Sequence, residues 1–214
     1  MNINKLHYIS QGDSPEQHLE NIQKACTSGV ELVQLRLKNC SEEVVLETAQ
    51  KAREITGNFQ TRLIINDHYK IAKTVKADGV HLGKTDTCPS IAREYLETWQ
   101  WIGGTANTLE DCKNLIAKKV DYIGLGPFRF TKTKKKLSPI LGLAGYQSIL
   151  DLLPGETPVI AIGGITFEDI PSILESGVHG IALSGELTKD FNKTPHIHKL
   201  LQTGADSEQV WKLS

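Results

Sequence analysis

Short apolar runs alternate with longer amphipathic stretches along almost the whole chain. The runs are four or five residues long, and several are continuously apolar, as expected of parallel strands that are covered on both faces. Eight strands are predicted in this way, at residues 6–10, 31–35, 62–66, 79–82, 101–105, 122–125, 159–162 and 180–183. Their regular return indicates a repeated unit of one strand and one helix.

The stretches between these strands carry apolar residues three and four positions apart, which is the period of an amphipathic helix. Helices are predicted over residues 14–28, 41–56, 108–118, 143–152, 167–176 and 195–201, with shorter ones after Asn66 and from about Pro89. Ser41 has the side chain of an N-cap. Gly29, Gly79 and Gly177 follow predicted helices, and we expect them to provide left-handed C-caps.

Strict alternation of strands and helices predicts a parallel sheet. Dividing 214 residues by eight units leaves about 27 residues for each, which suits one strand, one helix and their connections. The chain has no linker rich in Pro, Gly or Ser. We therefore predict an α/β protein whose residues 1–214 form a single (β/α)8 TIM barrel, with a polar tail at 203–214 that either docks on a neighbour or frays.

Composition and charge exclude several classes of protein. The 24 Lys and Arg residues balance 25 Asp and Glu residues to a net charge of −1, which argues against nucleic acid or an anionic membrane as a partner. No apolar run approaches the about 18 residues of a membrane span, and the first residues hold no apolar stretch long enough for a signal peptide. The cysteines are predicted to be free thiols in a reducing cytoplasm: Cys26, Cys40, Cys88 and Cys112.

Polar side chains follow the second, third and fourth strands, at the end of a barrel where active sites lie. Gln34, Arg36 and Lys38 alternate along the end of the second strand, so all three are expected on one side. Asp67 follows the third strand and Asp86 the fourth. Mg²⁺ usually takes one or two carboxylates together with substrate phosphates. This set predicts a site for a metal-bound polyphosphate, although Asp67 would also suit the N-cap of the next helix.

A second set of anion-binding signals follows the last three strands. Gly163 and Gly164 come after the seventh strand and Ser184 after the eighth, where barrels commonly bind a phosphate with backbone N–H groups. The long connection after the sixth strand carries hydroxyl and ammonium groups suited to a phosphate-binding lid, at Thr131, Thr133 and Lys134. Two anion sites on one face suit a two-substrate transfer in which pyrophosphate leaves.

These motifs resemble the thiamine phosphate synthase (thiamine-phosphate pyrophosphorylase) family over about residues 5–190. The family's motifs correspond to Gln34-x-Arg36-x-Lys38, Ile65-Asn66-Asp67, His81-x-Gly83-Lys84-x-Asp86, Gly124-Leu125-Gly126-Pro127, Thr131-x-Thr133-Lys134 and Ile162-Gly163-Gly164-Ile165. The resemblance implies a Mg²⁺-dependent transferase of thiamine biosynthesis with two small-molecule substrates. Hydroxymethylpyrimidine diphosphate would lose pyrophosphate by a dissociative path, and the nitrogen of a hydroxyethylthiazole phosphate would attack the methylene carbon to give thiamine phosphate.

The resemblance also implies a role for each matching position. The diphosphate would be held by Arg36, Lys38, Asn66 and Lys134, and Mg²⁺ by Asp67 and Asp86. The pyrimidine and the leaving group would face Gln34 and Thr105. The thiazole phosphate would be held by Thr131, Thr133, Gly163, Gly164 and Ser184. No protein nucleophile is required, because metal and cations stabilise the charge of the leaving group.

The chain departs from the family pattern at several positions. Lys84 stands in place of the usual Gln, Thr105 in place of Ser, His68 in place of a second acid and Phe130 in place of Pro. Lys132 stands in place of an acid and makes the lid segment more basic than usual. Three alternatives remain at this point. They are a thiazole tautomerase, disfavoured because Pro127 stands where that relative has a histidine; a non-catalytic barrel that binds a phosphorylated ligand; and an unrelated sugar-phosphate epimerase. The sequence leaves a homo-oligomer open.

Overall fold

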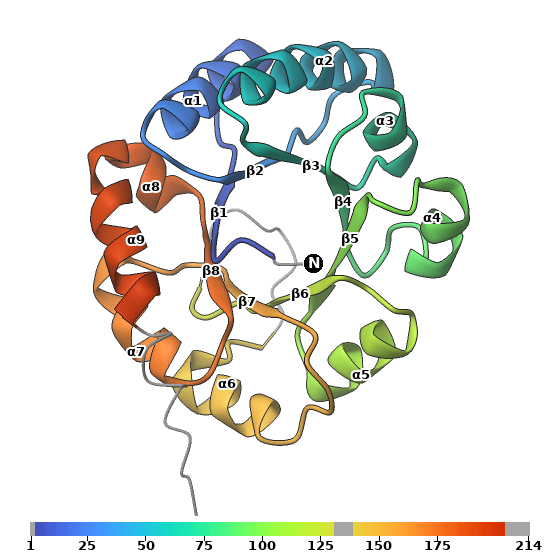
Figure 1. Ribbon diagram of the computed structural model, residues 1–214. Helices are drawn as coiled ribbons and strands as arrows, with labels where there is room; N and C mark the ends of the chain where they lie inside the picture. The colour runs from blue at the N-terminus through green and yellow to red at the C-terminus, as the bar shows by residue number, and fades with distance from the viewer. Residues whose placement is uncertain (1–2, 131–138, 204–214) are drawn as a thin grey trace, which may run out of the picture.

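The computed structural model describes residues 3–130 and 139–203, and the strands in these residues form one closed parallel barrel (Figure 1). Each strand pairs with the next in the chain, and β8 pairs with β1 to close the ring. The strands are β1 Leu6–Ile9, β2 Leu32–Leu35, β3 Arg62–Asn66, β4 Gly79–Leu82, β5 Trp101–Ala106, β6 Tyr122–Leu125, β7 Val159–Ile162 and β8 Gly180–Leu183. The predicted TIM barrel is therefore confirmed.

Helices surround this barrel on the outside (Figure 1). They are α1 Pro15–Thr27, α2 Glu42–Asn58, α3 Tyr69–Thr74, α4 Pro89–Tyr95, α5 Leu109–Ala117, α6 Gly142–Leu150, α7 Ile170–Glu175, α8 Gly185–Lys189 and α9 Thr194–Thr203, with 3-10 turns η1 Phe167–Asp169 and η2 Phe191–Lys193. Ser14, Ser41 and Thr108 cap α1, α2 and α5 by accepting a hydrogen bond from a backbone N–H of the first turn. Local chemistry therefore sets where these three helices begin.

The predicted strands agree with the structure to within one residue at each end. The predicted helix at 167–176 is divided into η1 and α7, and the short helix α8 has no counterpart in the prediction. Gly29 (φ 95°) and Gly177 (φ 91°) are left-handed as expected. The prediction for Gly79 is wrong, because it is the first residue of β4, and Lys76 (φ 51°) follows α3 in the left-handed conformation instead. A Cβ on Gly79 would lie 2.3 Å from the carbonyl oxygen of Trp101, so close strand packing explains this glycine.

Two hydrophobic layers hold the barrel together. The larger layer lies between the strands and the helices and includes Val80 and Leu82 of β4. The smaller layer fills the inside of the barrel with Ile3, Leu32, Ile64, Trp101, Tyr122, Ile160 and Ala182. Because side chains alternate along a strand, His81 points into this interior while its two neighbours face the helices. The interior is a packed core and its polar residues reach the mouth only at the carboxyl ends of the strands.

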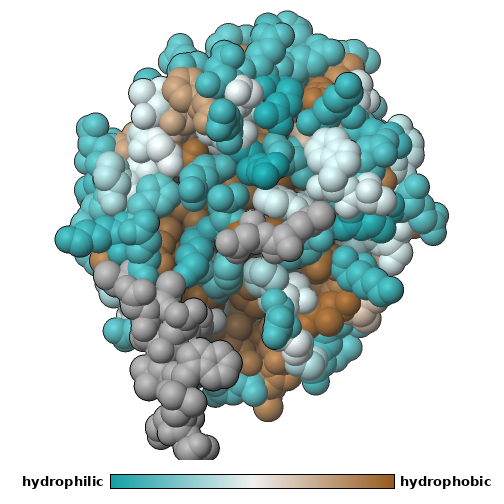
Figure 2. Space-filling model, viewed as in Figure 1, coloured by the Kyte–Doolittle hydropathy of each residue, from teal (hydrophilic) through white to brown (hydrophobic). Residues whose placement is uncertain are grey.

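Hydrophilic residues dominate the face shown in Figure 2, with hydrophobic surface in separate patches. Within residues 3–130 and 139–203, no helix has the length and apolar character needed to cross a membrane. All four cysteines lie in these ranges and are free, with Cys26 and Cys112 buried, as predicted.

Candidate active site

The ends of β2, β3 and β4 bring Lys38, Asp67 and Asp86 together. These strands are neighbours in the barrel, with Leu35 paired to Ile65 in register. The Lys38 ammonium donates to the carboxylate of Asp67. The carboxyl groups of Asp67 and Asp86 are themselves within hydrogen-bonding reach of each other. The expected meeting of a cation and two carboxylates at the mouth is therefore present.

Electrostatic coupling distinguishes the two carboxyl groups. Burial raises the pKa of Asp86, and the hydrogen bond with Asp67 raises it further. Burial also raises the pKa of Asp67, but hydrogen bonds with Asp86 and Lys38 outweigh this effect and hold its pKa below the ordinary value. The backbone N–H of Gly83 donates to Oδ2 of Asp86 over 2.6 Å and fixes that side chain. Two carboxylates this close favour either a shared proton or a bound cation.

Asp67 adopts an unusual backbone conformation. Its φ of 65° lies in the left-handed region, which is uncommon for a residue with a side chain. Its N–H donates to the carbonyl of His81 on the next strand over 2.9 Å, which holds it there. The N-cap of α3 is His68, so the alternative role of Asp67 as an N-cap is wrong. Backbone strain of this kind, worth about 1–3 kcal/mol, is concentrated at functional sites.

Asn66 has a buried amide group that lacks a partner. The residue is only 8% exposed, and its Nδ2 has no hydrogen-bond partner among the described residues. A buried donor left unsatisfied costs about 1–3 kcal/mol. Because Asn66 directly precedes Asp67 at the end of β3, this donor indicates that the mouth is built for a ligand with an acceptor atom.

The backbone of Arg36 is held by hydrogen bonds that no sequence motif predicts. Its backbone N–H donates to Oγ of Ser10 over 3.0 Å, and the same oxygen bonds Nδ1 of the buried His18 over 2.7 Å. Burial lowers the pKa of the Arg36 guanidinium, and the nearby charge of Asp67 opposes that effect. Neither Ser10 nor His18 belongs to a motif, and a lone buried histidine gives no signal in one sequence.

Gln34 and Thr105 occupy the expected strand ends. Gln34 is buried on β2, and Thr105 on β5 is half-buried with its hydroxyl bonded to Nε2 of His81 over 3.0 Å. Nδ1 of His81 lies 3.2 Å from the hydroxyl of Tyr122. In the sequence, His81 belongs to a motif but has no predicted function, and no pattern marks Tyr122 as part of the site.

The glycine pair after β7 meets a packing requirement that the sequence does not reveal. Gly163 (φ 95°) and Gly164 (φ 73°) are both left-handed. A Cβ on Gly163 would lie 2.9 Å from Cα of Pro127, and one on Gly164 would lie 2.6 Å from Cγ of Arg129. Close packing against the segment after β6 therefore requires glycine at both positions, and their binding of a phosphate stays a prediction. Ser184 directly follows β8 and precedes α8, as expected for the neighbouring loop.

Three predicted site residues and one departure from the family pattern remain. Thr131, Thr133 and Lys134, with Lys132 between them, lie outside the described residues. Lys84, in contrast, pairs with Asp111 over 2.8 Å, so this departure from the family pattern adds no unpaired cation to the mouth. Within the described ranges, no group of three or more His, Cys, Asp and Glu side chains is placed to hold a metal.

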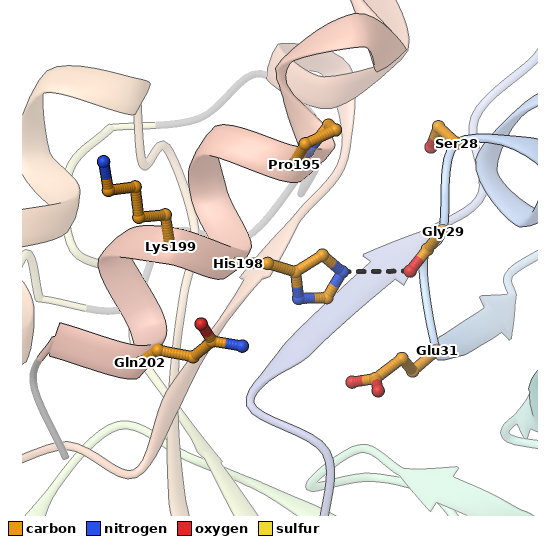
Figure 3. Close-up of a pocket in the computed structure, with 7 residues that line it drawn as sticks. All are labelled: Ser28, Gly29, Glu31, Pro195, His198, Lys199 and Gln202. Atoms are coloured by element: carbon orange, nitrogen blue, oxygen red, sulfur yellow. Dashed lines mark hydrogen bonds between the residues drawn. The ribbon is translucent and has the colours of Figure 1, made fainter.

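A hollow of about 490 Å³ lies away from these strand ends (Figure 3). It is lined by Ser28, Gly29, Glu31, Pro195, His198, Lys199 and Gln202. Figure 3 shows His198 of α9 facing the connection between α1 and β2, and its Nε2 bonds the carbonyl of Gly29 over 2.9 Å. That connection enters β2 at its amino end, so the hollow is separate from the mouth that gathers the predicted residues.

Known proteins with similar sequences and structures carry related names. The chain matches the family model described as thiamine monophosphate synthase over residues 6–187. It is 46% identical over 200 residues to the thiamine-phosphate synthase of Flavobacterium johnsoniae, covering 92% of this chain and 94% of that protein. For the Bacteroides fragilis thiamine-phosphate synthase the identity is 46% over 185 residues, covering 85% and 91%. The solved thiamine phosphate pyrophosphorylase from Pyrococcus furiosus has a TM-score of 0.78 and 26% identity, covering 94% of this chain and 96% of that one.

Fold and site together define a TIM-barrel protein with cations and carboxylates gathered at the carboxyl ends of its strands. Within that class, the chain belongs to the thiamine monophosphate synthase family. The resemblance read from the motifs is thereby confirmed. The names of the relatives support a transferase and give no support to a tautomerase or a non-catalytic barrel.

Proposed function

We propose that this chain is a thiamine-phosphate synthase that joins hydroxymethylpyrimidine diphosphate to hydroxyethylthiazole phosphate, releasing pyrophosphate. The observation that carries the proposal is the meeting of Lys38, Asp67 and Asp86 beside the unpartnered amide of Asn66. This arrangement offers donors and a cation to a polyanion and carboxylates to a metal ion. The names of the relatives then supply the organic parts of the two substrates.

The diphosphate would lie over the ends of β2 and β3. Arg36 and Lys38 would neutralise its oxygens, and Nδ2 of Asn66 would gain the acceptor that it lacks. Lys134 would add a further cation from the segment after β6. Because these donors are held in place before the reaction, they stabilise the charge that develops on the leaving group without further reorganisation.

Asp67 and Asp86 are the residues that would hold Mg²⁺. They fit the ion because two carboxyl groups converge and one of them has a raised pKa, which a divalent cation would reverse. When bound, Mg²⁺ would offset the negative charge of the diphosphate oxygens. Lys38 now donates to Asp67 and would turn toward the diphosphate in the complex.

The remaining predicted residues would position the two organic groups. Gln34 and Thr105 would face the pyrimidine and the bond that breaks. The thiazole phosphate would be held by Gly163, Gly164 and Ser184, together with Thr131 and Thr133. The carbon–oxygen bond to the diphosphate would break first, and the thiazole nitrogen would then supply the electron pair for the new carbon–nitrogen bond. A cytoplasmic, one-domain enzyme of this kind needs no nucleic acid or membrane partner.

A coupling assay with both phosphorylated substrates and Mg²⁺ tests the proposal directly. We expect thiamine phosphate and pyrophosphate to form in equal amounts, and chelation of Mg²⁺ to stop both. Absence of product alongside an active control synthase would overturn the proposal. Conversion of the thiazole phosphate to its tautomer without the pyrimidine substrate would instead support the isomerase.

A further inference from the structure

Three polar side chains form a chain of hydrogen bonds across the inside of the barrel. The hydroxyl of Tyr122 on β6 lies 3.2 Å from Nδ1 of His81 on β4. Nε2 of the same imidazole lies 3.0 Å from Oγ1 of Thr105 on β5. Tyr122 and His81 are buried at 2% and 6% exposure, whereas Thr105 is half-buried at the mouth. These hydrogen bonds therefore lead from the closed interior of the barrel to its substrate side.

Two glycines make room for these rings. A Cβ on Gly103 would lie 2.1 Å from Cζ of the Tyr122 ring, which no side chain allows. A Cβ on Gly124 would lie 3.0 Å from Cε1 of His81, the carbon between the two ring nitrogens. Both glycines occupy inward positions of their strands, level with Tyr122 and Thr105 respectively. The barrel therefore lacks two interior side chains beside the hydrogen bonds that join Tyr122, His81 and Thr105.

The hydroxyl of Tyr122 determines which atom donates in each of these hydrogen bonds. Burial raises the pKa of Tyr122, so its hydroxyl keeps its proton and must donate it to an acceptor. His7 packs edge-on against Tyr122 with ring centroids 5.2 Å apart, and Nε2 of His7 already bonds the carbonyl of Asn4 over 2.9 Å. The acceptor in line with the phenol is Nδ1 of His81, and the imidazole proton then resides on Nε2.

We propose that His81 is a positioning residue that, held in one tautomer by Tyr122, makes Thr105 a hydrogen-bond donor toward the pyrimidine diphosphate. Nε2–H donates to Oγ1 of Thr105, so the hydroxyl proton of Thr105 is directed to the mouth. Diphosphate oxygens and pyrimidine ring nitrogens are acceptors, which matches this direction. In the opposite tautomer, Nε2 would accept a hydrogen bond from the Thr105 hydroxyl, so its proton would point into the barrel. Oγ1 would then offer only an acceptor to the diphosphate oxygens and pyrimidine nitrogens, which are acceptors themselves. This inference rests on the proposed synthase function for the identity of the ligand.

Histidine ¹⁵N spectra test the tautomer without any substrate. We expect His81 in the wild-type protein at pH 7.5 to carry its proton on Nε2 and none on Nδ1. Tyr122→Phe should convert that signal to a mixture of tautomers, whereas Tyr8→Phe should leave it unchanged. Tyr8 is a matched control because its buried hydroxyl bonds Thr188 on the outer side of the barrel. A proton found on Nδ1 in the wild type would overturn the proposal, whatever the activity.

Kinetic variants separate positioning from folding. Tyr122→Phe should lower kcat about tenfold, the value of one hydrogen bond, with the KM for the thiazole phosphate unchanged. His81→Gln keeps a donor amide where Nε2 stood and cannot change tautomer, so it should retain more activity than His81→Leu. In the Gln background, Tyr122→Phe should cause no further loss.

Additive losses in the double variant would overturn the proposal, because they would mean that Tyr122 does not act through His81. Thermal unfolding of each variant shows whether it folds, and the wild-type tautomer decides the question if one does not. Absence of thiamine phosphate from the wild type would remove the proposed function and leave the tautomer result standing. The two failures are therefore distinguishable.

Discussion

Single side chains at the mouth have hydrogen-bonding capacity that the protein itself does not use. Asn66 holds a buried amide donor without a partner among the described residues, and Asp67 holds a strained backbone. Asp86 has a raised pKa because a second carboxyl group lies beside it. The unpartnered donor would be satisfied by a polyanion, and the repulsion between the two carboxyl groups would be relieved by a cation. These single residues at the mouth therefore give the clearest indication that a ligand binds there.

Asp67→Asn tests the carboxylate that would hold the metal ion. Asparagine keeps the size of the side chain and tolerates the left-handed conformation, so the fold should be retained. Losing the negative charge should reduce turnover by at least about a hundredfold and raise the Mg²⁺ concentration needed for half-maximal rate. Pyrophosphate release measured across a Mg²⁺ titration checks both effects. Wild-type rates in this variant would contradict the metal role.

The buried residue His7 is expected to make the stability of the protein depend on pH. Burial lowers the pKa of His7 to about 3, from 6.5 in the unfolded chain. Between these values the unfolded state binds a proton that the folded state does not. The contribution of neutral His7 to the free energy of unfolding is therefore complete above pH 6.5 and is lost as the pH falls. We expect His7 to remove about 1 kcal/mol of unfolding free energy per pH unit below 6.5.

Urea unfolding at pH 7.5, 6 and 5 measures this contribution. His7→Gln should reduce the loss of stability on acidification, and we expect this variant to be less stable than the wild type at pH 7.5. His196→Gln serves as the control, because His196 is exposed on α9 and its replacement should leave the pH dependence as it is. Equal pH dependence in the two variants would exclude His7 as the cause.

At the scale of elements, the segment after β6 is fastened to the loop after β7. The backbone N–H groups of Phe128 and Arg129 donate to the carbonyls of Ile162 and Gly163, over 3.0 and 3.1 Å. The guanidinium of Arg129 pairs with Asp169 over 2.8 Å. These contacts place the start of the segment that carries Thr131, Thr133 and Lys134 beside the expected phosphate loop.

Gly164→Ala should weaken this junction. The substitution combines a left-handed φ of 73° with a Cβ only 2.6 Å from Cγ of Arg129. Gly177→Ala has a similar φ but no atom within 4 Å of its Cβ, so it isolates the backbone cost. We expect about 1 kcal/mol of lost stability for Gly177→Ala, and about 1–3 kcal/mol more for Gly164→Ala because of overpacking. Denaturant unfolding measures the difference, and equal losses would show that the contact is unimportant.

At the scale of the whole molecule, the two ends of the barrel have different tasks. At the amino end, Asp78 accepts hydrogen bonds from Arg53 of α2 and Arg62 of β3, each over 2.7 Å, and from the N–H of Leu63 over 2.8 Å. This cluster connects α2, β3 and the start of β4. The carboxyl end holds the groups of the proposed site, so stability and activity should respond to different substitutions.

Asp78→Ala should therefore lower stability and leave the chemistry intact. Losing the carboxylate leaves two partly exposed arginines and a backbone N–H without their acceptor, at a cost of about 2–3 kcal/mol. We expect a reduced melting temperature and an unchanged KM for both substrates at 15 °C. Glu47→Gln, which removes an exposed ion pair with Lys51, is the matched control and should change little. A raised KM in Asp78→Ala would contradict the division between the two ends.

The strands were predictable because each is a short apolar run bordered by turn residues, a pattern that needs no long-range information. The short helix α8 was not, since five residues after Ser184 carry too little periodicity to stand out from a turn. The prediction of a C-cap at Gly79 was wrong for a related reason. Glycine signals freedom of φ, but here it is required by the approach of Trp101 from the neighbouring strand.

By itself, the sequence determined the eightfold alternation of strands and helices and therefore which polar residues stand at strand ends. Closure of the barrel decided which of them meet, because parallel register joins residues that are far apart in the chain. The bond between Tyr122 and His81 spans 41 positions, and the one between Lys38 and Asp67 spans 29. No local pattern encodes such contacts, since the distance between two side chains depends on the stagger and curvature of every strand between them.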